Sequence, residues 1–443
     1  MAPSSQTSSP ATIFWFRRDL RLHDNHGLFR ALELSDNVIP VFVFDPEILN
    51  DLHNPDDRRV TFIYETLEHI QNELRKIGKS LIVRYGTPVQ VMYSLCDEYT
   101  IERLVTNHDY EPYAIDRDTA VQDMLARRNI PMLTFKDHVV FERTEVTKAD
   151  GKPYTIYTPY SKAWRARLEQ TGLPRFDSEK LLDRLCTLGE SPFPSLESMG
   201  FRRVQLRVPK KEPNTDVIRA YHEQRNFPGV DGTTEIGIHL RFGTVSTRDM
   251  IRRAQGLNDT WYSELIWREF FSMILANYPH VVTQSFKPDY DDVKWRNNDE
   301  EFAAWCEGKT GYPMVDAGMR QLVATGHMHN RVRMVVASFL CKHLLIDWRK
   351  GEAFFAKHLL DYDLASNNGN WQWAAGCGCD AAPYFRVFNP HEQLRKFDPE
   401  LVYVRRWLTD NEISFPQPIV EHAFARNRAL AAYKHALRGN ESF

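Results

Sequence analysis

Ile39-Pro40-Val41-Phe42-Val43-Phe44 is the stretch that decides the fold of the N-terminal part of this chain of 443 residues. It is a short apolar run, and amphipathic segments lie on both sides of it, the longest over residues 60–77. Similar apolar runs recur before and after it. Strand and helix alternating about four times predict a doubly wound parallel sheet, which is a Rossmann-like α/β domain. The other predicted strands are residues 13–16, 81–83, 104–105 and 132–133, and the shorter predicted helices lie near 28–34, 89–96 and 120–126.

The rest of the chain has two further kinds of pattern. From about residue 147 to residue 211 the periodicity dissolves, and runs such as Ser191-Pro192-Phe193-Pro194 are typical of a long connector across a surface. Beyond Val217, apolar residues repeat at spacings of three and four, which predicts an all-helical domain. Helices are expected over 250–254, 262–276, 314–324, 333–345 and 354–360. We therefore predict a flexible tail over residues 1–10, an α/β domain over 11–135, a linker over 136–211 and a helical domain over 212–443.

Composition and charge exclude several classes of protein. With 42% hydrophobic residues the chain can build cores, which excludes a disordered or collagen-like protein. No apolar run approaches the roughly 18 residues of a membrane span, and no signal segment opens the chain. Six scattered cysteines favour a reduced compartment, so we expect a cytoplasmic protein without membrane contact. Because the net charge is −3, any contact with nucleic acid must come from a local patch.

Several familiar catalytic motifs are missing from the sequence. There is no Walker loop, no His-Glu-x-x-His zinc motif and no Gly-x-Ser-x-Gly elbow. Gly376-Cys377-Gly378-Cys379 has no second cysteine pair beside it, so it predicts a tight turn, and we expect no metal site. The predicted sheet also lacks Gly-x-Gly-x-x-Gly, so a ligand there is not held as in an ordinary dinucleotide fold.

Two segments of the helical part have the residue types of a ligand site. Gly232-Thr233-Thr234-Glu235-Ile236-Gly237 offers hydroxyls and backbone N–H groups before a helix, which suits a phosphate but equally an ordinary helix N-cap. Further on, Glu264, Trp267, Arg268 and Phe271 share one helix face. A flat heteroaromatic ligand would supply stacking and polar partners there. A surface ion pair beside a core tryptophan is the alternative.

Tryptophan is unusually frequent, with ten residues, eight of them from Trp261 onward. Asp361-Tyr362-Asp363-Leu364-Ala365-Ser366-Asn367-Asn368-Gly369-Asn370-Trp371-Gln372-Trp373 is dense in polar groups yet holds two of them, and Trp348 is nearby. Several oxidisable indoles around one polar site indicate electron transfer. For Trp164, Trp305 and Trp407 the interpretation as large core residues is favoured.

These motifs resemble those of the photolyase/cryptochrome flavoproteins. The resemblance runs from Phe16-Arg17-Arg18-Asp19-Leu20-Arg21 to Phe397-Asp398, and its most specific stretches are residues 264–271, 328–334 and 361–388. Within the family the chain is most similar to bacterial class I cyclobutane pyrimidine dimer photolyases. The resemblance implies an N-terminal α/β domain, a long linker and a helical domain that binds one FAD in a U-shaped form.

The resemblance assigns the cofactor residues by motif. Arg333 and Asp361 would form an ion pair beside the isoalloxazine, and Asp363 would meet its polar edge. Asn367 would face flavin N5, where an amide cannot donate a proton as an acid does, and this suits a flavin kept anionic and fully reduced. Gly237 stands where the family often has Ser. The full cofactor set is Tyr221, Thr233, Thr234, Glu235, Ile236, Gly237, Trp261, Glu264, Arg268, Arg333, Asp361, Tyr362, Asp363 and Asn367.

The resemblance also assigns the DNA side of the site. Trp267 and Trp373 would sandwich a flipped-out dimer, Met334 would pack on it, and Glu264 and Asn330 would bond its base edges. With Asn367 at the flavin, Glu264, Asn330, Trp267 and Met334 make up the implied catalytic set. The remaining residues implied are Arg225, Arg331, Gln393 and Lys396 for DNA phosphates, and Trp371, Trp348 and Trp295 for electron transfer to the flavin.

The function that follows is light-dependent repair of cyclobutane pyrimidine dimers by electron transfer from excited reduced FAD, in a monomer that binds damaged DNA. A protonated Glu264 would assist through a hydrogen bond to the lesion. One alternative is a cryptochrome-type light sensor, and another is repair of (6-4) photoproducts, whose enzymes generally pair two histidines at the lesion. A second, antenna chromophore stays open, because residues 107–113 do not reproduce the Asn-Glu pair of folate-binding relatives. It could be a deazaflavin or a flavin, or the site could be empty.

Overall fold

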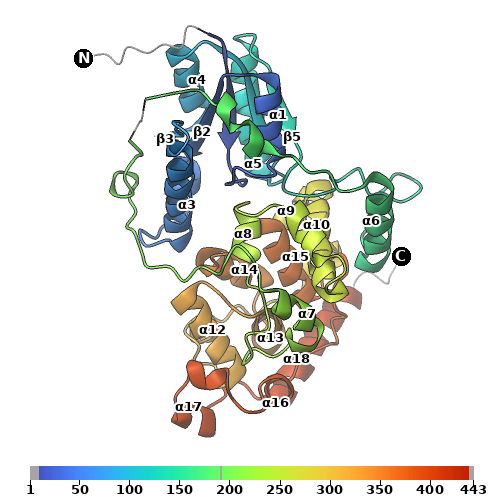
Figure 1. Ribbon diagram of the computed structural model, residues 1–443. Coiled ribbons are helices and arrows are strands. Elements are labelled where there is room, and N and C mark those ends of the chain that lie inside the picture. The colour runs from blue at the N-terminus through green and yellow to red at the C-terminus, as the bar shows by residue number, and fades with distance from the viewer. Residues whose placement is uncertain (1–8, 190–191, 439–443) are drawn as a thin grey trace. The chain divides into compact units, whose positions relative to one another are not determined.

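The computed structural model describes residues 9–189 and 192–438 and is drawn in Figure 1. It divides into two compact units. The first comprises the chain up to residue 142 together with 167–211 and 236–253, and the second comprises 143–166, 212–235 and the chain from 254 onward. Of the predicted linker, residues 136–142 and 167–211 thus belong to the first unit and residues 143–166 to the second. Most of the predicted tail over residues 1–10 lies outside the described residues.

The first unit is built on a five-stranded parallel sheet, coloured from blue to cyan in Figure 1. The strand order β3-β2-β1-β4-β5 places β1 at the centre, paired with β2 and β4. The strands are β1 (Ala11–Phe16), β2 (Val38–Phe44), β3 (Ile82–Tyr85), β4 (Ile101–Asn107) and β5 (Met132–Phe135). The helices are α1 (His26–Leu34), α2 (Pro46–Asn50), α3 (Arg58–Arg75), α4 (Pro88–Glu98), α5 (Pro112–Ala126), α8 (Gly237–Arg241) and α9 (Thr247–Ala254), with 3-10 turns η1 (Ser178–Arg184) and η2 (Glu197–Met199).

Different helices cover the two faces of this sheet. Trp15 of β1 packs in one cluster with buried residues of α4 and α5. On the opposite face Phe14 lies against Gly27 of α1, where a Cβ would come within 3.0 Å of the phenyl ring. Phe44 of β2, on that same side, lies beside Tyr64 of α3 with ring centroids 6.2 Å apart. Helices on both faces of a parallel sheet confirm the doubly wound prediction.

One helix of the first unit is longer than the sequence pattern predicts. The pattern predicts a helix near residues 120–126, whereas α5 starts at Pro112. Its buried residues are only Ala114, Val121 and Leu125, so the first two turns have little apolar periodicity. Proline is well tolerated in the first turn of a helix, because its missing N–H has no intrahelical partner there. The first turn of α5 is therefore specified by Pro112 and not by an apolar face.

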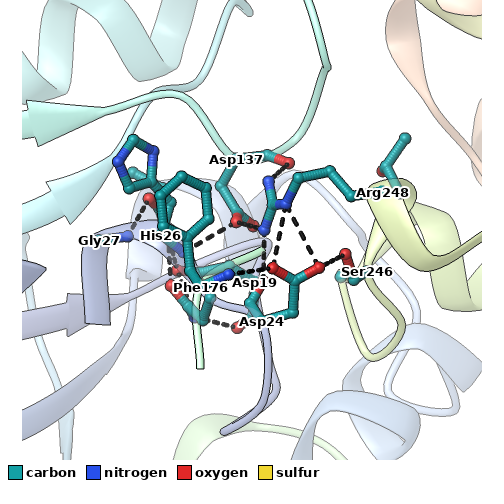
Figure 2. A network of polar contacts seen from close by, with 12 residues as sticks. Asp19, Asp24, His26, Gly27, Asp137, Phe176, Ser246 and Arg248 are labelled. Carbon is teal, nitrogen blue, oxygen red and sulfur yellow. Dashed lines mark hydrogen bonds and ion pairs between the residues drawn. The ribbon is translucent and has the colours of Figure 1, made fainter. Parts of the chain in front are cut away.

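A buried ion-pair network joins residues 246–248 to the sheet within the first unit. Figure 2 shows the guanidinium of Arg248 between Asp24 and Asp137, both buried. Its Nη2 donates to Asp137 at 2.8 Å and its Nε to Asp24 at 3.2 Å. Arg21 donates to Asp137 at 2.6 Å, and Ser246 Oγ donates to Asp24 at 2.6 Å. Burial alone would raise the pKa of Asp137, but the two arginines lower it well below its usual range.

The second unit is helical, as predicted. The N-terminal part of α6 belongs to it, as do a π-helical segment and several 3-10 turns. α6 lies inside the predicted linker, where the sequence pattern predicts no helix. The helices are α6 (Tyr157–Thr171), α7 (Thr215–Gln224), α10 (Asp259–Asn277), α11 (Asp299–Cys306), α12 (Pro313–Thr325), α13 (Asn330–Ser338), α14 (Trp348–His358), α15 (Leu364–Ala375), α16 (Pro390–Phe397), α17 (Asp410–Ser414) and α18 (His422–Arg438). The short segments are η3 (Pro279–Val282), η4 (Pro288–Asp292), the π-helix η5 (Phe339–Leu344) and η6 (Val404–Arg406).

The core of the second unit explains several of the tryptophans. Trp305 is fully buried in the main cluster and Trp164 is fully buried beside α10, whereas Trp407 is only partly buried at the cluster's edge. The predicted helix over 333–345 changes to π geometry at Phe339 and ends at Leu345, whose φ is +51°. In the part of the chain that the structure describes, no helix is long and apolar enough to cross a bilayer.

The ends of α15 are fixed by the residues around it. Asp363 caps the N-terminus by accepting from the backbone N–H of Ser366. At the C-terminus the N–H groups of Gly376, Cys377 and Gly378 all donate to the carbonyl of Gln372, and Gly376 has a φ of +96°. The glycine–cysteine segment is therefore a tight turn, as predicted. No group of three or more potential metal ligands occurs within residues 9–189 and 192–438.

Candidate active site

A pocket with about 590 Å³ of empty space opens in the second unit among α13, α14 and α15. Its wall combines charged and polar side chains with apolar ones such as Ala337, Phe355 and Leu359. Seven residues that the sequence analysis assigns to flavin or lesion line it together, namely Asn330, Arg333, Met334, Asp361, Asp363, Asn367 and Trp373, and Trp371, assigned to electron transfer, lines it as well.

An ion pair forms one side of this pocket. Arg333 of α13 donates through Nη2 to both carboxylate oxygens of Asp361, at 3.0 and 3.1 Å. Its Nε donates to the carbonyl of Met328 at 2.7 Å, which fixes the guanidinium plane. Both side chains are partly exposed, at 25% and 21%. The pair therefore keeps polar atoms at the pocket surface that a ligand edge can reach.

Asn367 is held by a residue that the sequence analysis does not identify. Its Nδ2 donates to Glu352 twice, to Oε1 at 2.7 Å and to the backbone carbonyl at 3.2 Å. Both amide hydrogens are thereby used, so Oδ1 is the atom left for the pocket. Burial raises the pKa of the Glu352 carboxyl, and the hydrogen bond from Asn367 partly opposes this. Asn367 can thus accept a hydrogen bond from a ligand in a fixed orientation.

The tryptophans assigned to electron transfer pack around a glycine of α14. A Cβ on Gly351 would lie 2.2 Å from the indole of Trp371, so only glycine permits this approach of α14 to α15. Trp348 lies three positions before Gly351 and therefore on the same helix face. Trp371 and Trp348 are almost fully buried, whereas Trp295 is half-buried at the edge of the same core. Of the three, Trp371 lines the pocket, so the electron-transfer order stays a prediction.

A second cluster lies on the face of α10 that the sequence analysis singles out. Glu264 forms an ion pair with Arg225, which follows α7. The guanidinium of Arg225 also lies 5.9 Å from the ring centroid of Tyr221. Burial raises the pKa of Glu264, and the attraction of Arg225 opposes this. Arg225 therefore favours the ionised form of Glu264, and its removal would favour the protonated form.

Trp267 and Trp373 lie on two helices that contact each other. Phe271, one turn after Trp267 on α10, packs so closely on α15 that a Cβ on Gly369 would lie 2.2 Å from its ring. Trp373 lies one turn after that glycine. Both indoles are half-buried, and Trp267 is stacked on Tyr157 with ring centroids 3.6 Å apart and an angle of 6°. The structure therefore places the two predicted lesion tryptophans near one helix crossing.

The predicted phosphate turn is tied to α10 and to the residues before α13. Trp261 donates through Nε1 to Thr234 at 3.3 Å. Glu235 has a φ of +50° and lies 3.4 Å from His327. The division between the two units falls directly after Glu235, so Ile236 and Gly237 belong to the first unit, where Gly237 begins α8.

Two residues assigned to DNA have buried polar atoms without partners. Arg331 lies over the ring of Phe397 at 4.2 Å and donates to Asn226 at 2.7 Å, yet its Nε has no partner among the described residues. Gln393, one turn before Phe397 on α16, has an unpartnered Oε1 in the same part of the chain. Unsatisfied buried polar atoms are rare in folded proteins. Eight further buried atoms in the described part of the chain also lack a partner, so this feature is not confined to the residues assigned to DNA.

Comparison with known proteins agrees with this geometry. The model of the DNA photolyase family matches residues 12–178, and the model of the FAD binding domain of DNA photolyase matches residues 261–413. A deoxyribodipyrimidine photo-lyase of Halobacterium salinarum is 35% identical over 97% of this chain and 100% of its own length. The chain belongs to the DNA photolyase family.

Solved structures of photolyases have the same fold. A bacterial class III photolyase from Agrobacterium tumefaciens is similar with a TM-score of 0.83 at 32% identity, covering 99% of this chain and 100% of that one. An archaeal photolyase from Sulfolobus tokodaii, described with two FAD molecules, has a TM-score of 0.78 at 32% identity, covering 96% and 100%. The α/β and helical units of this chain are therefore those of a photolyase.

The pocket residues fit the flavin that a photolyase FAD-binding domain takes. One wall is apolar and suits a flat ring system, and the other offers the Arg333 guanidinium, the Asp361 and Asp363 carboxylates and the Asn367 amide to its polar edge. In the described part of the chain, Tyr221, Trp261, Glu264, Arg268 and Tyr362 lie outside the residues that line this pocket. Arg268 follows Trp267 on α10, and Tyr362 follows Asp361.

Sequence reasoning missed residues whose role depends on contacts between distant segments. Glu352 supports Asn367, and Tyr157 stacks on Trp267, although neither belongs to a quoted motif. Gly351 and Gly369 are glycines inside helices, where glycine is unfavourable by about 0.8–1.0 kcal/mol relative to alanine. That local signal alone could have marked both positions as close packing sites.

Proposed function

We propose that this photolyase repairs cyclobutane pyrimidine dimers in DNA under light. The observation that carries the proposal is the pocket among α13, α14 and α15, whose wall combines four residues assigned to the flavin (Arg333, Asp361, Asp363 and Asn367) with three assigned to the lesion (Asn330, Met334 and Trp373). A lesion bound beside Asn330, Met334 and Trp373 would be in direct reach of a flavin bound beside Arg333 and Asn367. The name of the Halobacterium relative supports the same reaction.

FAD bound in this pocket, in its fully reduced anionic form, would supply under light the electron that opens the cyclobutane ring and would take it back once the ring has split, while the protein would supply binding and orientation. Arg333 and Asp361 hold the polar edge of the ring system. Asn367 presents an acceptor oxygen and, with its amide hydrogens on Glu352, has no proton to give. The apolar wall excludes water from the reacting centre. The predicted single flavin and its U-shaped form belong to this proposal.

Glu264 is proposed to donate a hydrogen bond to the bound lesion. This requires a protonated carboxyl, and burial raises the pKa of Glu264 in that direction. Arg225 is the group that holds the carboxylate ionised. A DNA phosphate that attracts Arg225 would remove this opposition, because the half-exposed carboxyl would then have lost its cationic partner. Lesion binding and protonation of Glu264 would thus be coupled.

Dimer repair is favoured over repair of (6-4) photoproducts by the residues of α13 that line the pocket. Asn330 and Met334 occupy the face where two histidines would be expected for that second reaction. His329 precedes them, but its Nδ1 accepts from the Arg331 backbone N–H, and burial lowers its pKa to about 3. It is therefore a neutral cap and not an acid for catalysis.

A second chromophore is proposed for a pocket of about 800 Å³ in the first unit. It lies at the carboxyl ends of β1 and β2, where doubly wound sheets bind ligands. Trp15 and Phe44 provide flat walls, and Tyr113 donates to Asp45 at 2.5 Å. The Sulfolobus photolyase with two FAD molecules supports a flavin in this role. Denaturing release followed by chromatography would identify the molecule, and absence of any second chromophore from freshly purified protein would contradict it.

Three further assignments complete the proposal. On its motifs we assign the protein to class I, although the Agrobacterium relative belongs to class III. We also propose that it is a monomer in the cytoplasm that binds DNA through local patches around Arg225, Arg331 and Gln393. Light scattering after size-exclusion chromatography would measure the oligomeric state directly.

Illumination of the purified, chemically reduced protein with dimer-containing DNA tests the main proposal. We expect the dimers to be converted to the original pyrimidines in the light and not in the dark. DNA with (6-4) photoproducts is the matched control and should stay unchanged. A flavin-loaded protein that leaves dimers intact under saturating light would instead be a sensor, and the repair assignment would be wrong.

A further inference from the structure

The segment that begins α6 packs along α10, although it lies inside the predicted linker. Trp164 donates through Nε1 to Glu269 at 2.5 Å, and Tyr160 lies 5.2 Å from the ring of Phe270. Arg165 also donates to the Ser263 hydroxyl at 3.0 Å. α6 therefore packs against α10 through its side chains, and Tyr160 and Trp164 are buried there.

Tyr157, the first residue of α6, is held at three points in the second unit. Its hydroxyl donates to the carbonyl of Ser263 at 2.8 Å, directly before Glu264. Its backbone N–H donates to Asp380 at 3.0 Å, five residues beyond the end of α15. Its ring is nearly parallel to the indole of Trp267 at 3.6 Å. One residue thus links the α10 cluster to the C-terminal end of the helix that bears Trp373.

A tryptophan that must stack on a ligand loses rotational freedom when the ligand binds. Ordering one side chain at an interface costs about 0.5–1.5 kcal/mol, and a residue already ordered in the free protein avoids that cost. The parallel ring of Tyr157 and the edge of Phe270, 5.6 Å away, restrict the indole of Trp267 before any ligand arrives. The stack covers one face of the indole; Phe271 lies at 29° to it with ring centroids 5.5 Å apart, and the indole as a whole stays half-exposed.

We propose that Tyr157 is a positioning residue for damage recognition: it covers one face of Trp267 and presents the opposite face to the flipped pyrimidine dimer. This inference rests on the repair function proposed above and adds a residue of the linker region to the lesion-binding wall. A gate that leaves on binding is disfavoured, because Tyr157 would have to give up two hydrogen bonds and the stack. Tyr157 itself does not contact the lesion in this proposal; the indole of Trp267 does.

Binding titrations at one salt concentration test this role. Tyr157→Ala should lower the preference for dimer-containing over undamaged duplex by about two- to tenfold, the factor for ordering one side chain. Tyr157→Phe keeps the ring and should restore the preference to within about twofold, since it loses only one hydrogen bond. Tyr154→Ala is the matched control, because Tyr154 contacts Tyr160 and not Trp267. It should leave the preference unchanged.

Two further measurements separate positioning from general support of the fold. In a Trp267→Ala background, Tyr157→Ala should have no further effect on the preference, since its action passes through the indole. Hydroxyl-radical footprinting of the free protein should show faster oxidation of Trp267 in Tyr157→Ala than in Tyr154→Ala. Additive losses in the double variant, or a stronger preference in Tyr157→Ala, would overturn the inference. A wild-type protein without any preference for damaged DNA would instead overturn the proposed function itself.

Discussion

The two units of this photolyase differ in how far their buried polar atoms are satisfied: among the described residues one such atom, Arg21 Nε, lacks a partner in the first unit, whereas nine lack one in the second. In the first unit the carboxylates of Asp24 and Asp137 receive donors from Arg248 and from other groups of the same unit, as Figure 2 shows. In the second unit Arg331 Nε and Gln393 Oε1 have no partner within the described residues. A closed network stabilises a fold and has little to offer a ligand. Buried polar atoms without partners destabilise the free protein, and a ligand that forms hydrogen bonds with them offsets this cost when it binds.

The largest expected effect is on the closed network. Arg248→Ala removes the cation that buried Asp24 and Asp137 share and leaves them only Arg252 and Arg21, so the free energy of unfolding of the first unit should fall by about 3–5 kcal/mol. Urea unfolding monitored by hydrogen exchange of the sheet would measure it. Arg252→Ala is the control, because Arg252 reaches Asp24 only at 3.5 Å and is 30% exposed. If both variants lost the same free energy of unfolding, the buried network would contribute no more to stability than a partly exposed ion pair.

Trp371→Phe should separate the two photochemical steps of the second unit. Phenylalanine is harder to oxidise than tryptophan but fills a similar space beside Gly351. Photoreduction of oxidised flavin should slow by about a hundredfold, equivalent to about 2.7 kcal/mol on the barrier. Repair by chemically reduced protein should be largely retained. Flash photolysis and a repair assay on the same preparation would decide it, and parallel loss of both activities would indicate a structural role for Trp371.

Trp267→Ala tests the proposed lesion-binding surface of the second unit. The substitution removes a stacking surface worth about 1–3 kcal/mol per base, so preference for dimer-containing DNA should fall by roughly ten- to a hundredfold. Affinity for undamaged duplex should barely change, because that affinity depends on phosphate contacts. If titrations show both duplexes weakened equally, the indole is a packing residue and the lesion wall is misplaced.

The smallest effect is expected at the unsatisfied guanidinium. Arg331→Gln should weaken damaged and undamaged duplexes to a similar extent, by a few-fold, and lower the slope of log affinity against log salt by about 1. The reason is that a phosphate contact carries no sequence or damage information. Lys309→Gln, a change at a side chain paired with Glu307 and 66% exposed, is a control of equal charge. A selective loss for damaged DNA would assign Arg331 to the lesion instead.

The sequence predicted what periodicity and local chemistry determine. The strands of the sheet, α10 and α12 follow from apolar spacing, and the turn at Gly376 follows from its glycines. It did not predict α6, because a start with Tyr157, Thr158 and Pro159 carries no amphipathic signal, and this helix is specified by its packing on α10. The partners Glu352 and Tyr157 depend on segments that meet only in the folded chain, so no pattern within one segment reveals them.

The glycines inside α14 and α15 limit which positions can be varied when this protein is engineered for new photochemistry. Gly351 and Gly369 each face an aromatic ring at a distance that excludes even one methyl group. Libraries that randomise α14 and α15 uniformly would therefore lose most clones at these two codons before any catalysis is screened. Ser366 and Asn370 line the same pocket without that constraint. Diversity placed there can reshape the cavity while the helix spacing stays as it is.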